Sequence, residues 1–546
     1  MNKRDVGVQF RFRRNDRIGA PEAEGDDLFL FECFVDTGDI DVLKDASRPE
    51  RIIVGRTGSG KSALLRKLEN DAENTIRIPP ENLALNYLSN SEVIRFYEEA
   101  GTNLDLFYQL LWRHVLVVEL IKFKYKIQNE QSQKSFLSSL TQIFHRDKAK
   151  EKAVDYLRLW GESFWNETHT RIKEMTTRIE DELKSGLGSS SLIAKISVNG
   201  ASKLTAEEKK EVVTHGSRVV AKIQIKELAE VIKLLAEEIF NDPQEIHYIV
   251  IDDLDTQWAG DPLKNRLIRA LIETVKTFRQ IPNVKVVVAL RQDLLERVIA
   301  TTRDSGFQSE KYESLYLKIK WSERQIEDIL NRRIGHLVRQ RYTSRTISMT
   351  ELFPPRIQKS SFSEFLIGRT FLRPRDAIIF INSCLDLADG RGQIDSRLVL
   401  EAEGSYSEKR IESLQDEWSA TFPKVASYLK IFARGPTKLL VSDLSEEKIK
   451  HWAFEYLLND ADLLDPITRL AQQTFLEEKL SFFKFKLELL QALYSVGAIG
   501  IKPEPTTKML WSYCTDYQPS DGSIRPTSVL ELHPVFWRAV GARPTT

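Results

Sequence analysis

The sequence RIIVGRTGSGKSALLRKLE, residues 51–69, decides the fold class of this chain. A short apolar run, IIV at 52–54, leads into a loop of glycine, serine and threonine, and a helix-forming segment begins at Lys61. An apolar run bounded by glycine is typical of a strand buried in a parallel sheet. The loop from Gly55 to Ser62 also fits G-x-x-x-x-G-K-[ST], the pattern of a phosphate-binding loop. A strand, this loop and a helix in that order predict an α/β P-loop NTPase core, in which helices flank a parallel sheet.

Each residue type of the loop suits the binding of a nucleotide. Gly58 and Gly60 let the backbone curl so that consecutive N–H groups point at phosphate oxygens. Lys61 is predicted to reach the β- and γ-phosphates, and the Ser62 hydroxyl is predicted to bind Mg²⁺. The residues expected to contact the nucleotide are Gly55, Arg56, Thr57, Gly58, Ser59, Gly60, Lys61, Ser62 and Ala63. A glycine turn with an exposed lysine is the alternative, but the flanking strand and helix favour ATP and Mg²⁺ as cofactors.

A second apolar run, YIVI at 248–251, ends in acidic residues. We predict that Asp252, at the carboxyl end of this strand, holds Mg²⁺ together with Ser62. Asp253 is predicted to orient and polarise the attacking water, which is the work of a general base. Asp255 is expected to fix the geometry of the following loop. The alternative is that these acids cap a turn, since aspartate is common at strand ends.

Two arginines complete the predicted site. Arg291 ends the apolar run VVVAL and is expected to contact the γ-phosphate and sense its loss; the alternative is a helix-start arginine paired with Asp293 or Glu296. The segment FLRPRD, 371–376, places Arg375 at a predicted helix start. Arg375 is predicted to reach the phosphates from a helical lid, and the alternative is a salt bridge with Asp376 or a capping role. Lys61, Asp253 and Arg291 are thus the predicted catalytic residues.

Composition narrows the class of protein. Lys plus Arg and Asp plus Glu number 79 each, so the formal net charge is zero and a strongly basic nucleic-acid binder is not indicated. The three cysteines, Cys33, Cys384 and Cys514, lie far apart and suit a reducing cytoplasm. The most membrane-like window, residues 104–123, is interrupted by Arg113 and Glu119, so we expect a buried helix and no membrane insertion. The N-terminus has no apolar signal-peptide core. We therefore expect a cytoplasmic protein.

The chain of 546 residues is too long for one hydrophobic core, so several domains are expected. Changes of pattern along the sequence set their predicted boundaries. The predicted parts are a lead-in arm at 1–50, the first half of the P-loop core at 51–95, a mainly helical insertion at 96–240, the second half of the core at 241–322, a helical lid and helical domain at 323–480, and a winged-helix-like domain at 481–546. Residues 515–527 would form the wing.

Together, GRTGSGKS, YIVIDDLD, VVVALR and FLRPRD resemble the bacterial P-loop ATPases related to the KAP and STAND groups and, more distantly, origin-recognition-type AAA+ proteins. KAP ATPases usually carry membrane helices in the insertion, which this sequence lacks. STAND proteins usually fuse an effector domain to the ATPase, and none is visible in residues 1–50. The resemblance therefore implies an ATP-driven switch that forms a homo-oligomer or acts on a separately encoded effector, as in signalling or anti-phage defence. An ATP-dependent DNA-binding protein of the loader type, which would use the winged helix, is the alternative.

Overall fold

The computed structural model describes residues 11–80, 91–126, 138, 168–185, 195–196, 201, 204–222, 225–256, 258, 261–302, 309–341, 347–515 and 517–544. The chain divides into two compact units. The sheet unit comprises Asp36–Arg56 and Lys61–Ile319, and the helical unit comprises the described parts of Met1–Val35, Thr57–Gly60 and Lys320–Thr546. The tip of the glycine-rich loop thus belongs to the helical unit, whereas the strand and helix that flank the loop belong to the sheet unit.

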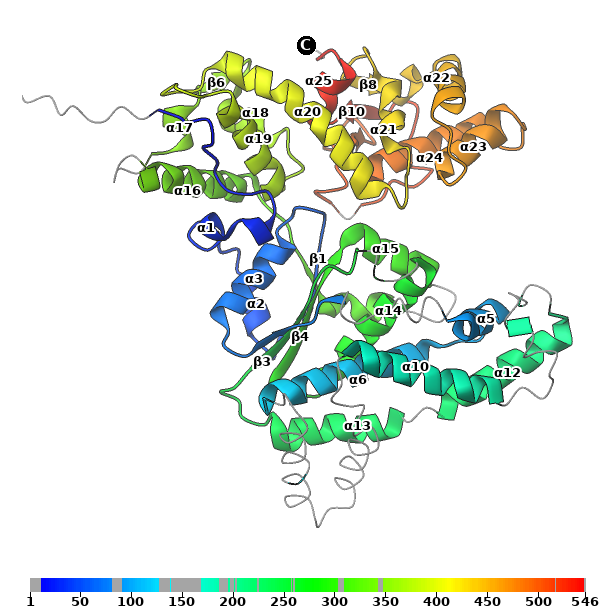
Figure 1. The fold of residues 1–546 in the computed structure, drawn as a ribbon. Helices are drawn as coiled ribbons and strands as arrows, with labels where there is room; N and C mark the ends of the chain where they lie inside the picture. Colours follow the sequence, from blue (N-terminus) through cyan, green and yellow to red (C-terminus); the bar gives the residue numbers. More distant parts are fainter. Residues whose placement is uncertain are drawn as a thin grey trace, which may run out of the picture. The chain divides into compact units, whose positions relative to one another are not determined.

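A five-stranded parallel sheet forms the centre of the sheet unit (Figure 1). Its strands are β1 (Ile52–Gly55), β2 (Thr75–Arg77), β3 (His247–Ile251), β4 (Val284–Arg291) and β5 (Tyr316–Lys318). Their order across the sheet is β2-β3-β4-β1-β5, and every neighbouring pair is parallel. β1 and β3 are buried along their whole length, because helices cover both faces of the sheet. The apolar runs that the sequence predicted as core strands are therefore confirmed.

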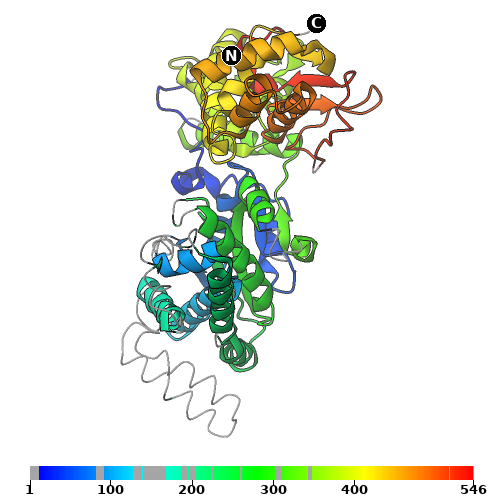
Figure 2. The same cartoon turned by 90° about the vertical axis from the view of Figure 1, so that its right-hand side faces the viewer.

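The flanking helices follow from the same segments of sequence (Figures 1 and 2). α2 (Asp39–Lys44) and α3 (Lys61–Asp71) lie on one face of the sheet, and α14 (Asp261–Phe278) lies on the other. α3 begins at Lys61 and buries its leucines, Leu64, Leu65 and Leu68. Their spacing places them on one side of the helix, which is the side that faces the core. α15 (Gln292–Thr301) begins directly after β4, so that strand and helix meet at the carboxyl edge of the sheet.

Between β2 and β3 the described chain is helical. The helices are α5 (Glu92–Ala100), α6 (Asp105–Lys124), α10 (Thr168–Ser185), α12 (Ala206–Lys222) and α13 (Ile225–Leu234), followed by a π-helix at Leu235–Ile239. A reciprocal capping box begins α12, since the Thr205 N–H donates to Glu208 Oε2 (2.9 Å) and the Glu208 N–H donates to Thr205 Oγ1 (3.3 Å). Residues 127–137, 139–167, 186–194, 197–200, 202–203 and 223–224 of the predicted insertion at 96–240 lie outside the described part of the chain.

The most membrane-like window of the sequence forms α6, a buried helix that packs against α14. Trp112 fixes this contact, because its indole Nε1 donates to the Leu267 carbonyl at 2.8 Å. His114 is buried in the same helix although it is polar. None of the helices that the structure describes is long and apolar enough to cross a membrane.

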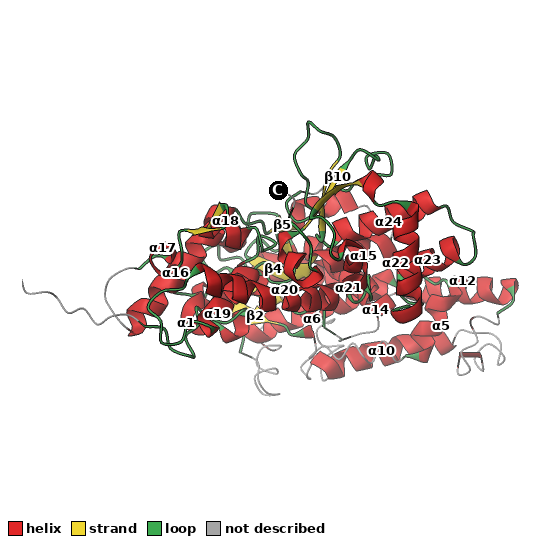
Figure 3. Cartoon of the chain, turned by 90° about the horizontal axis from the view of Figure 1, so that it is seen from above, coloured by secondary structure: helices red, strands yellow, loops and turns green. Residues whose placement is uncertain are grey.

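The helical unit has an apolar core of its own. Its first part contains α1 (Asp27–Leu30), α16 (Glu323–Arg341), α17 (Met349–Leu352), α18 (Phe362–Ile367), α19 (Pro374–Asp386) and α20 (Ser396–Trp418), together with the short antiparallel pair β6 (Arg356–Ile357) and β7 (Ser360–Ser361). Ser322 and Gln325 form a capping box before α16. Helices dominate the described chain (Figure 3).

A three-stranded antiparallel sheet lies in the last part of the helical unit. Its strands are β8 (Lys438–Leu440), β9 (Ile499–Lys502) and β10 (Val529–Leu532), in the order β8-β10-β9. Around it the chain forms α21 (Val425–Tyr428), α22 (Glu446–Asn459), α23 (Pro466–Phe475), α24 (Phe482–Ser495) and α25 (Trp537–Val540). Because β8 precedes residue 481, the sheet joins residues from both sides of that predicted domain boundary.

Candidate functional site

The glycine-rich loop connects β1, which ends at Gly55, with α3, which begins at Lys61. Gly58 has φ +75° and Gly60 has φ +97°. Residues that carry a Cβ adopt such positive φ values only at a cost in free energy. The backbone conformation itself therefore favours glycine at Gly58 and Gly60. The positive end of α3 begins one residue after Gly60, where helix N–H groups have no partner within the helix and favour anions.

Lys61 lies within its own loop. Its Nζ donates to the carbonyls of Gly55 and Arg56, both at 3.1 Å. The Lys61 ammonium therefore lies against the backbone of the loop, close to where an anion bound by the loop would be. Ser62 follows in the first turn of α3, beside Ala63.

Two hydroxyl groups of the loop tip have no hydrogen-bond partner in the described structure. Thr57 Oγ1 and Ser59 Oγ are both inaccessible to solvent and unpaired. Buried polar groups are normally hydrogen-bonded, so an unpaired pair of hydroxyls within one loop suggests a polar ligand. Phosphate oxygens fit these donors.

Asp252 directly follows β3 and is buried. Burial raises the pKa of its carboxyl group, and hydrogen bonds from the Ser62 hydroxyl and the Asp253 N–H lower it, as do the positive charges of Arg77 and Lys61. Asp252 Oδ2 has no hydrogen-bond partner and lies 3.9 Å from Arg77 Nη1. The sequence predicted that Asp252 lies beside the loop. The hydrogen bond between the Ser62 hydroxyl and the Asp252 carboxylate brings these two predicted Mg²⁺ ligands together. They meet although β4 lies between β3 and β1 in the sheet.

Asp253 is exposed and has φ +59°. Aspartate tolerates this left-handed conformation better than most residues, but it still costs free energy, and such residues are concentrated at functional sites. The Asp253 carbonyl anchors the turn by accepting hydrogen bonds from the Thr256 N–H (3.2 Å) and Oγ1 (2.8 Å). The turn therefore holds the backbone of Asp253, the residue after Asp252, while the Asp253 carboxylate is exposed.

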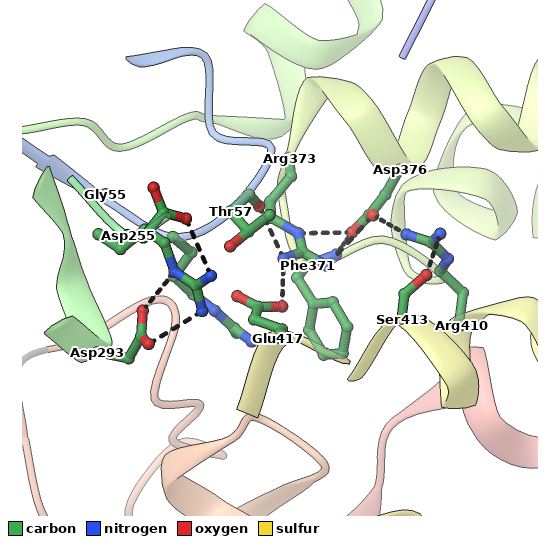
Figure 4. Close-up of polar contacts among 12 residues, drawn as sticks. Gly55, Thr57, Asp255, Asp293, Phe371, Arg373, Asp376, Arg410, Ser413 and Glu417 are labelled. Carbon is green, nitrogen blue, oxygen red and sulfur yellow. Dashed lines mark hydrogen bonds and ion pairs between the residues drawn. The ribbon is translucent and has the colours of Figure 1, made fainter. Parts of the chain in front are cut away.

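Arg291 ends β4, and its Cα is paired with that of Gly55 on β1. Its guanidinium binds Asp293 in a bidentate way, with Nε to Oδ1 at 2.9 Å and Nη2 to Oδ2 at 3.0 Å. Nη1 donates to Asp255 Oδ2 at 3.2 Å (Figure 4). The structure thus contains the ion pair with Asp293 that the sequence offered as an alternative, and it assigns Asp255 to the same arginine.

Arg375 occupies the second position of α19, which begins at Pro374 as predicted. Its side chain lies over Gly58, since a Cβ added to Gly58 would be 2.7 Å from the Arg375 Cβ. The Arg375 N–H donates to the Gly58 carbonyl at 3.4 Å, and its Nε donates to the Pro21 carbonyl at 3.1 Å. The sequence offered a salt bridge with Asp376 as the alternative for Arg375, and the described structure forms that bridge with Arg373.

Sequence reasoning missed three residues that contact the site. Trp321 Nε1 donates to the Ser59 carbonyl at 2.8 Å. Arg373 Nη1 donates to the Thr57 carbonyl at 2.8 Å (Figure 4). Arg77, at the end of β2, contacts Asp252 and forms a bidentate pair with Glu69. The motif FLRPRD was a signal for Arg373, but its two arginines could not be told apart; Trp321 and Arg77 belong to no motif.

Two protein-family models match parts of this chain. The KAP family P-loop domain matches residues 41–319, and the FunZ-associated C-terminal helical domain matches residues 324–415. A search of curated proteins gave no match.

Three solved structures are similar to the chain over most of its length. A Walker-type ATPase of Pyrococcus abyssi is 14% identical, with a TM-score of 0.33, over 88% of this chain and 94% of that chain. The ORC2 protein of Aeropyrum pernix, solved as ADPNP–ADP complexes, is 11% identical, with a TM-score of 0.36, over 93% of each chain. Cdc6p from Pyrobaculum aerophilum is 12% identical, with a TM-score of 0.28, over 94% of this chain and 96% of that chain.

The five-stranded parallel sheet, the glycine-rich loop after β1 and the buried aspartate after β3 define a P-loop NTPase. The chain belongs to the KAP family of P-loop proteins, as the family match over residues 41–319 shows. The resemblance to KAP ATPases inferred from the motifs is therefore confirmed.

Proposed function

We propose that this protein is an ATP-binding and ATP-hydrolysing switch of the STAND and KAP type, which couples its nucleotide state to assembly or to a separately encoded effector. The observation that carries the proposal is Asp252, a buried carboxylate that is hydrogen-bonded to the Ser62 hydroxyl and has one oxygen without a hydrogen-bond partner. Burying a carboxylate without a full set of partners is unfavourable unless a ligand or cation completes them. A role in signalling or defence rests on the resemblance alone and stays a prediction.

Lys61 is the residue that changes partners in this proposal. Its ammonium donates to the carbonyls of Gly55 and Arg56, and phosphate oxygens are stronger acceptors because they carry charge. Asp253, exposed at the end of β3, orients the attacking water and accepts its proton. Arg291 senses the γ-phosphate, which competes with Asp255 and Asp293 for its guanidinium. Arg375, lying over Gly58, contacts the phosphates.

The donor set at the end of β3 fits Mg²⁺. A carboxylate and a hydroxyl are the hard oxygen ligands that this ion prefers, and Asp252 Oδ2 is buried without a hydrogen-bond partner. Ser62 and Asp252 would hold the ion, which supplies positive charge that offsets the charge on the phosphate oxygens. Among the described residues no group of three or more His, Cys, Asp and Glu side chains could hold a metal alone, so the nucleotide would provide the further ligands.

The sheet β8-β10-β9 supports the proposal of a winged-helix-like arrangement, in which the predicted wing, residues 515–527, belongs to the segment between β9 and β10. The lysines of α24 favour contact with protein over contact with nucleic acid. Lys484 pairs with Glu488 at 2.9 Å and with Asp521 at 3.0 Å, and Lys486 Nζ donates to two backbone carbonyls. Cations with acidic or carbonyl partners add little to phosphate binding. A partner protein or a second copy of the chain is therefore the proposed target.

Light scattering coupled to size-exclusion chromatography tests the switch. The wild-type protein is run with Mg²⁺ and either ADP or a non-hydrolysable ATP analogue, and Lys61→Ala is run in the same buffers. We expect the wild-type mass to differ between the two nucleotides and the mass of the variant to be the same with both. A wild-type mass that is identical with ADP and with the analogue contradicts the assembly switch. DNA binding at low salt that requires ATP would instead support the loader alternative.

A further inference from the structure

We propose that the helical unit positions the phosphate-binding loop by holding three consecutive loop carbonyls, so that Trp321 and Arg373 act as positioning residues for the nucleotide. The group of donors, here called the carbonyl clamp, consists of Trp321, Arg373 and Arg375. This inference rests on the proposed function, because it concerns the geometry of the same loop.

Each carbonyl at the tip of the loop has its own donor in the clamp. The bonds run from Arg373 Nη1 to the Thr57 oxygen (2.8 Å), from the Arg375 N–H to the Gly58 oxygen (3.4 Å), and from Trp321 Nε1 to the Ser59 oxygen (2.8 Å). The donors come from two places in the sequence, the segment before α16 and the start of α19. Residues more than 200 positions away in the sequence thus hold three consecutive carbonyls of the loop, which indicates that the tertiary structure supports the loop conformation.

Holding a carbonyl also fixes the next N–H group. A trans peptide is planar, so its C=O and N–H bonds point in opposite directions. The clamp on the carbonyls of Thr57, Gly58 and Ser59 therefore fixes the N–H groups of Gly58, Ser59 and Gly60, directed away from the clamp. These are the N–H groups that a phosphate-binding loop turns toward phosphate oxygens. A loop that is ordered in advance loses less conformational entropy when the nucleotide binds.

Buried ion pairs hold the clamp itself in place. Arg373 Nε donates to Asp376 Oδ2 at 2.8 Å, and its Nη1 donates to Glu417 Oε2 at 2.9 Å as well as to the loop (Figure 4). Burial opposes the charge of Arg373, but the carboxylates of Asp376 and Glu417 outweigh it and raise the pKa of the guanidinium. The guanidinium also lies 4.9 Å from the centre of the Phe371 ring. Arg373 is thus a fixed donor with almost no freedom to follow a displaced loop.

The test removes one clamp bond and keeps the ion pairs intact. Trp321→Phe removes the indole donor together with part of the ring's packing, whereas a change at Arg373 would remove a buried charge that Asp376 and Glu417 both contact. Trp537→Phe is the matched control, because Trp537 is also partly buried and its Nε1 donates to the Leu532 carbonyl at 2.7 Å. The dissociation constants of ADP and of a non-hydrolysable ATP analogue are measured by calorimetry with Mg²⁺, and thermal midpoints are measured without nucleotide.

We expect Trp321→Phe to bind both nucleotides about 5- to 10-fold more weakly than wild type, the effect of one hydrogen bond, with the thermal midpoint of the control. Trp537→Phe should bind as wild type does. If wild type binds nucleotide and Trp321→Phe binds equally well, the clamp is overturned and the proposed function stands. A lower midpoint for Trp321→Phe with unchanged affinity also overturns it, because that is the result of a purely structural role. If wild type binds neither nucleotide, the proposed function fails, and the clamp proposal fails with it.

Discussion

The ion-pair network beneath the carbonyl clamp makes Asp376 the most informative residue to change for stability. Asp376 is fully buried and accepts hydrogen bonds from Arg373 Nε (2.8 Å), Arg410 Nη1 (2.7 Å) and the Phe371 N–H (3.2 Å). Burial opposes its ionisation, but the two guanidiniums outweigh burial and hold the pKa of Asp376 at about 2. Asp376→Asn keeps the size of the side chain and removes the charge that both arginines share.

The expected loss follows from two independent estimates. A pKa that falls from 3.8 in the unfolded chain to about 2 in the folded protein contributes roughly 2 kcal/mol of stability at neutral pH. Removing one partner of a buried ion pair costs about 3–5 kcal/mol, because buried charge is left with less compensation. Here Arg410 and Arg373 lose the carboxylate that they share, although Arg373 keeps Glu417. We therefore expect Asp376→Asn to lower the free energy of unfolding by about 2–5 kcal/mol. The pKa of Asp376 is depressed, so its contribution is present above pH about 4 and is lost as the pH falls toward 2.

Urea unfolding followed by tryptophan fluorescence measures this loss. Asp460→Asn is the control in the same unit, since Asp460 accepts hydrogen bonds from Lys430 Nζ (2.7 Å) and Ser427 Oγ (3.0 Å) in a more exposed ion pair. Such pairs contribute about 0–1 kcal/mol. The reasoning is refuted if Asp376→Asn shifts the midpoint no further than Asp460→Asn does.

Three further predictions concern the loop, the catalytic base and a buried lysine. Gly58→Ala, whose Cβ would lie 2.7 Å from that of Arg375, should weaken nucleotide binding at least tenfold in a fluorescent-nucleotide titration. Gly390→Ala is the control, because Gly390 has a similar φ of +73° and open space around its Cβ, and it should bind as wild type does. Equal nucleotide affinities of the two variants would contradict this prediction. Asp253→Asn should keep nucleotide affinity and lose phosphate release, and loss of both would show that Asp253 has another role. Burial lowers the pKa of Lys285 from 10.5 to about 7, so the unfolded chain holds one more proton between these values and stability should rise with pH across that window. Lys285→Met should flatten this rise in urea midpoints taken at pH about 7 and about 9, and a rise of the same size would refute it.

The sequence was informative where local pattern and function coincide. The loop from Gly55 to Ser62 predicted a strand, a turn and a helix, and the structure has β1, glycines with positive φ and α3 at those places. The apolar runs before Asp252 and Arg291 predicted buried strands for the same reason, since parallel strands with both faces covered are apolar throughout. The spacing of apolar residues along strands and helices, with periods of 2 and 3.6 residues, and the spacing of glycines are local properties, so a single sequence reveals them.

Contacts between distant segments were not predictable. In FLRPRD the side chain of Arg373 turns inward to Asp376, three residues later, and Arg375 turns toward the carbonyl of Pro21. The two arginines have the same chemistry, and only the tertiary packing distinguishes them. Trp321 contacts a loop 262 residues earlier in the sequence, and no local pattern encodes such a pairing. The strand order that places β4 between β1 and β3 likewise depends on topology and not on any motif.

The central claim is that this chain hydrolyses ATP through the loop that contains Lys61. The most direct measurement is the rate of phosphate release from ATP and Mg²⁺ by wild type and by Lys61→Ala, with no added acceptor. We predict measurable turnover by wild type and a loss of at least about 100-fold in the variant, because the Lys61 ammonium, held at the Gly55 and Arg56 carbonyls, is the proposed source of positive charge for the β- and γ-phosphates. Turnover by Lys61→Ala at the wild-type rate would contradict the account.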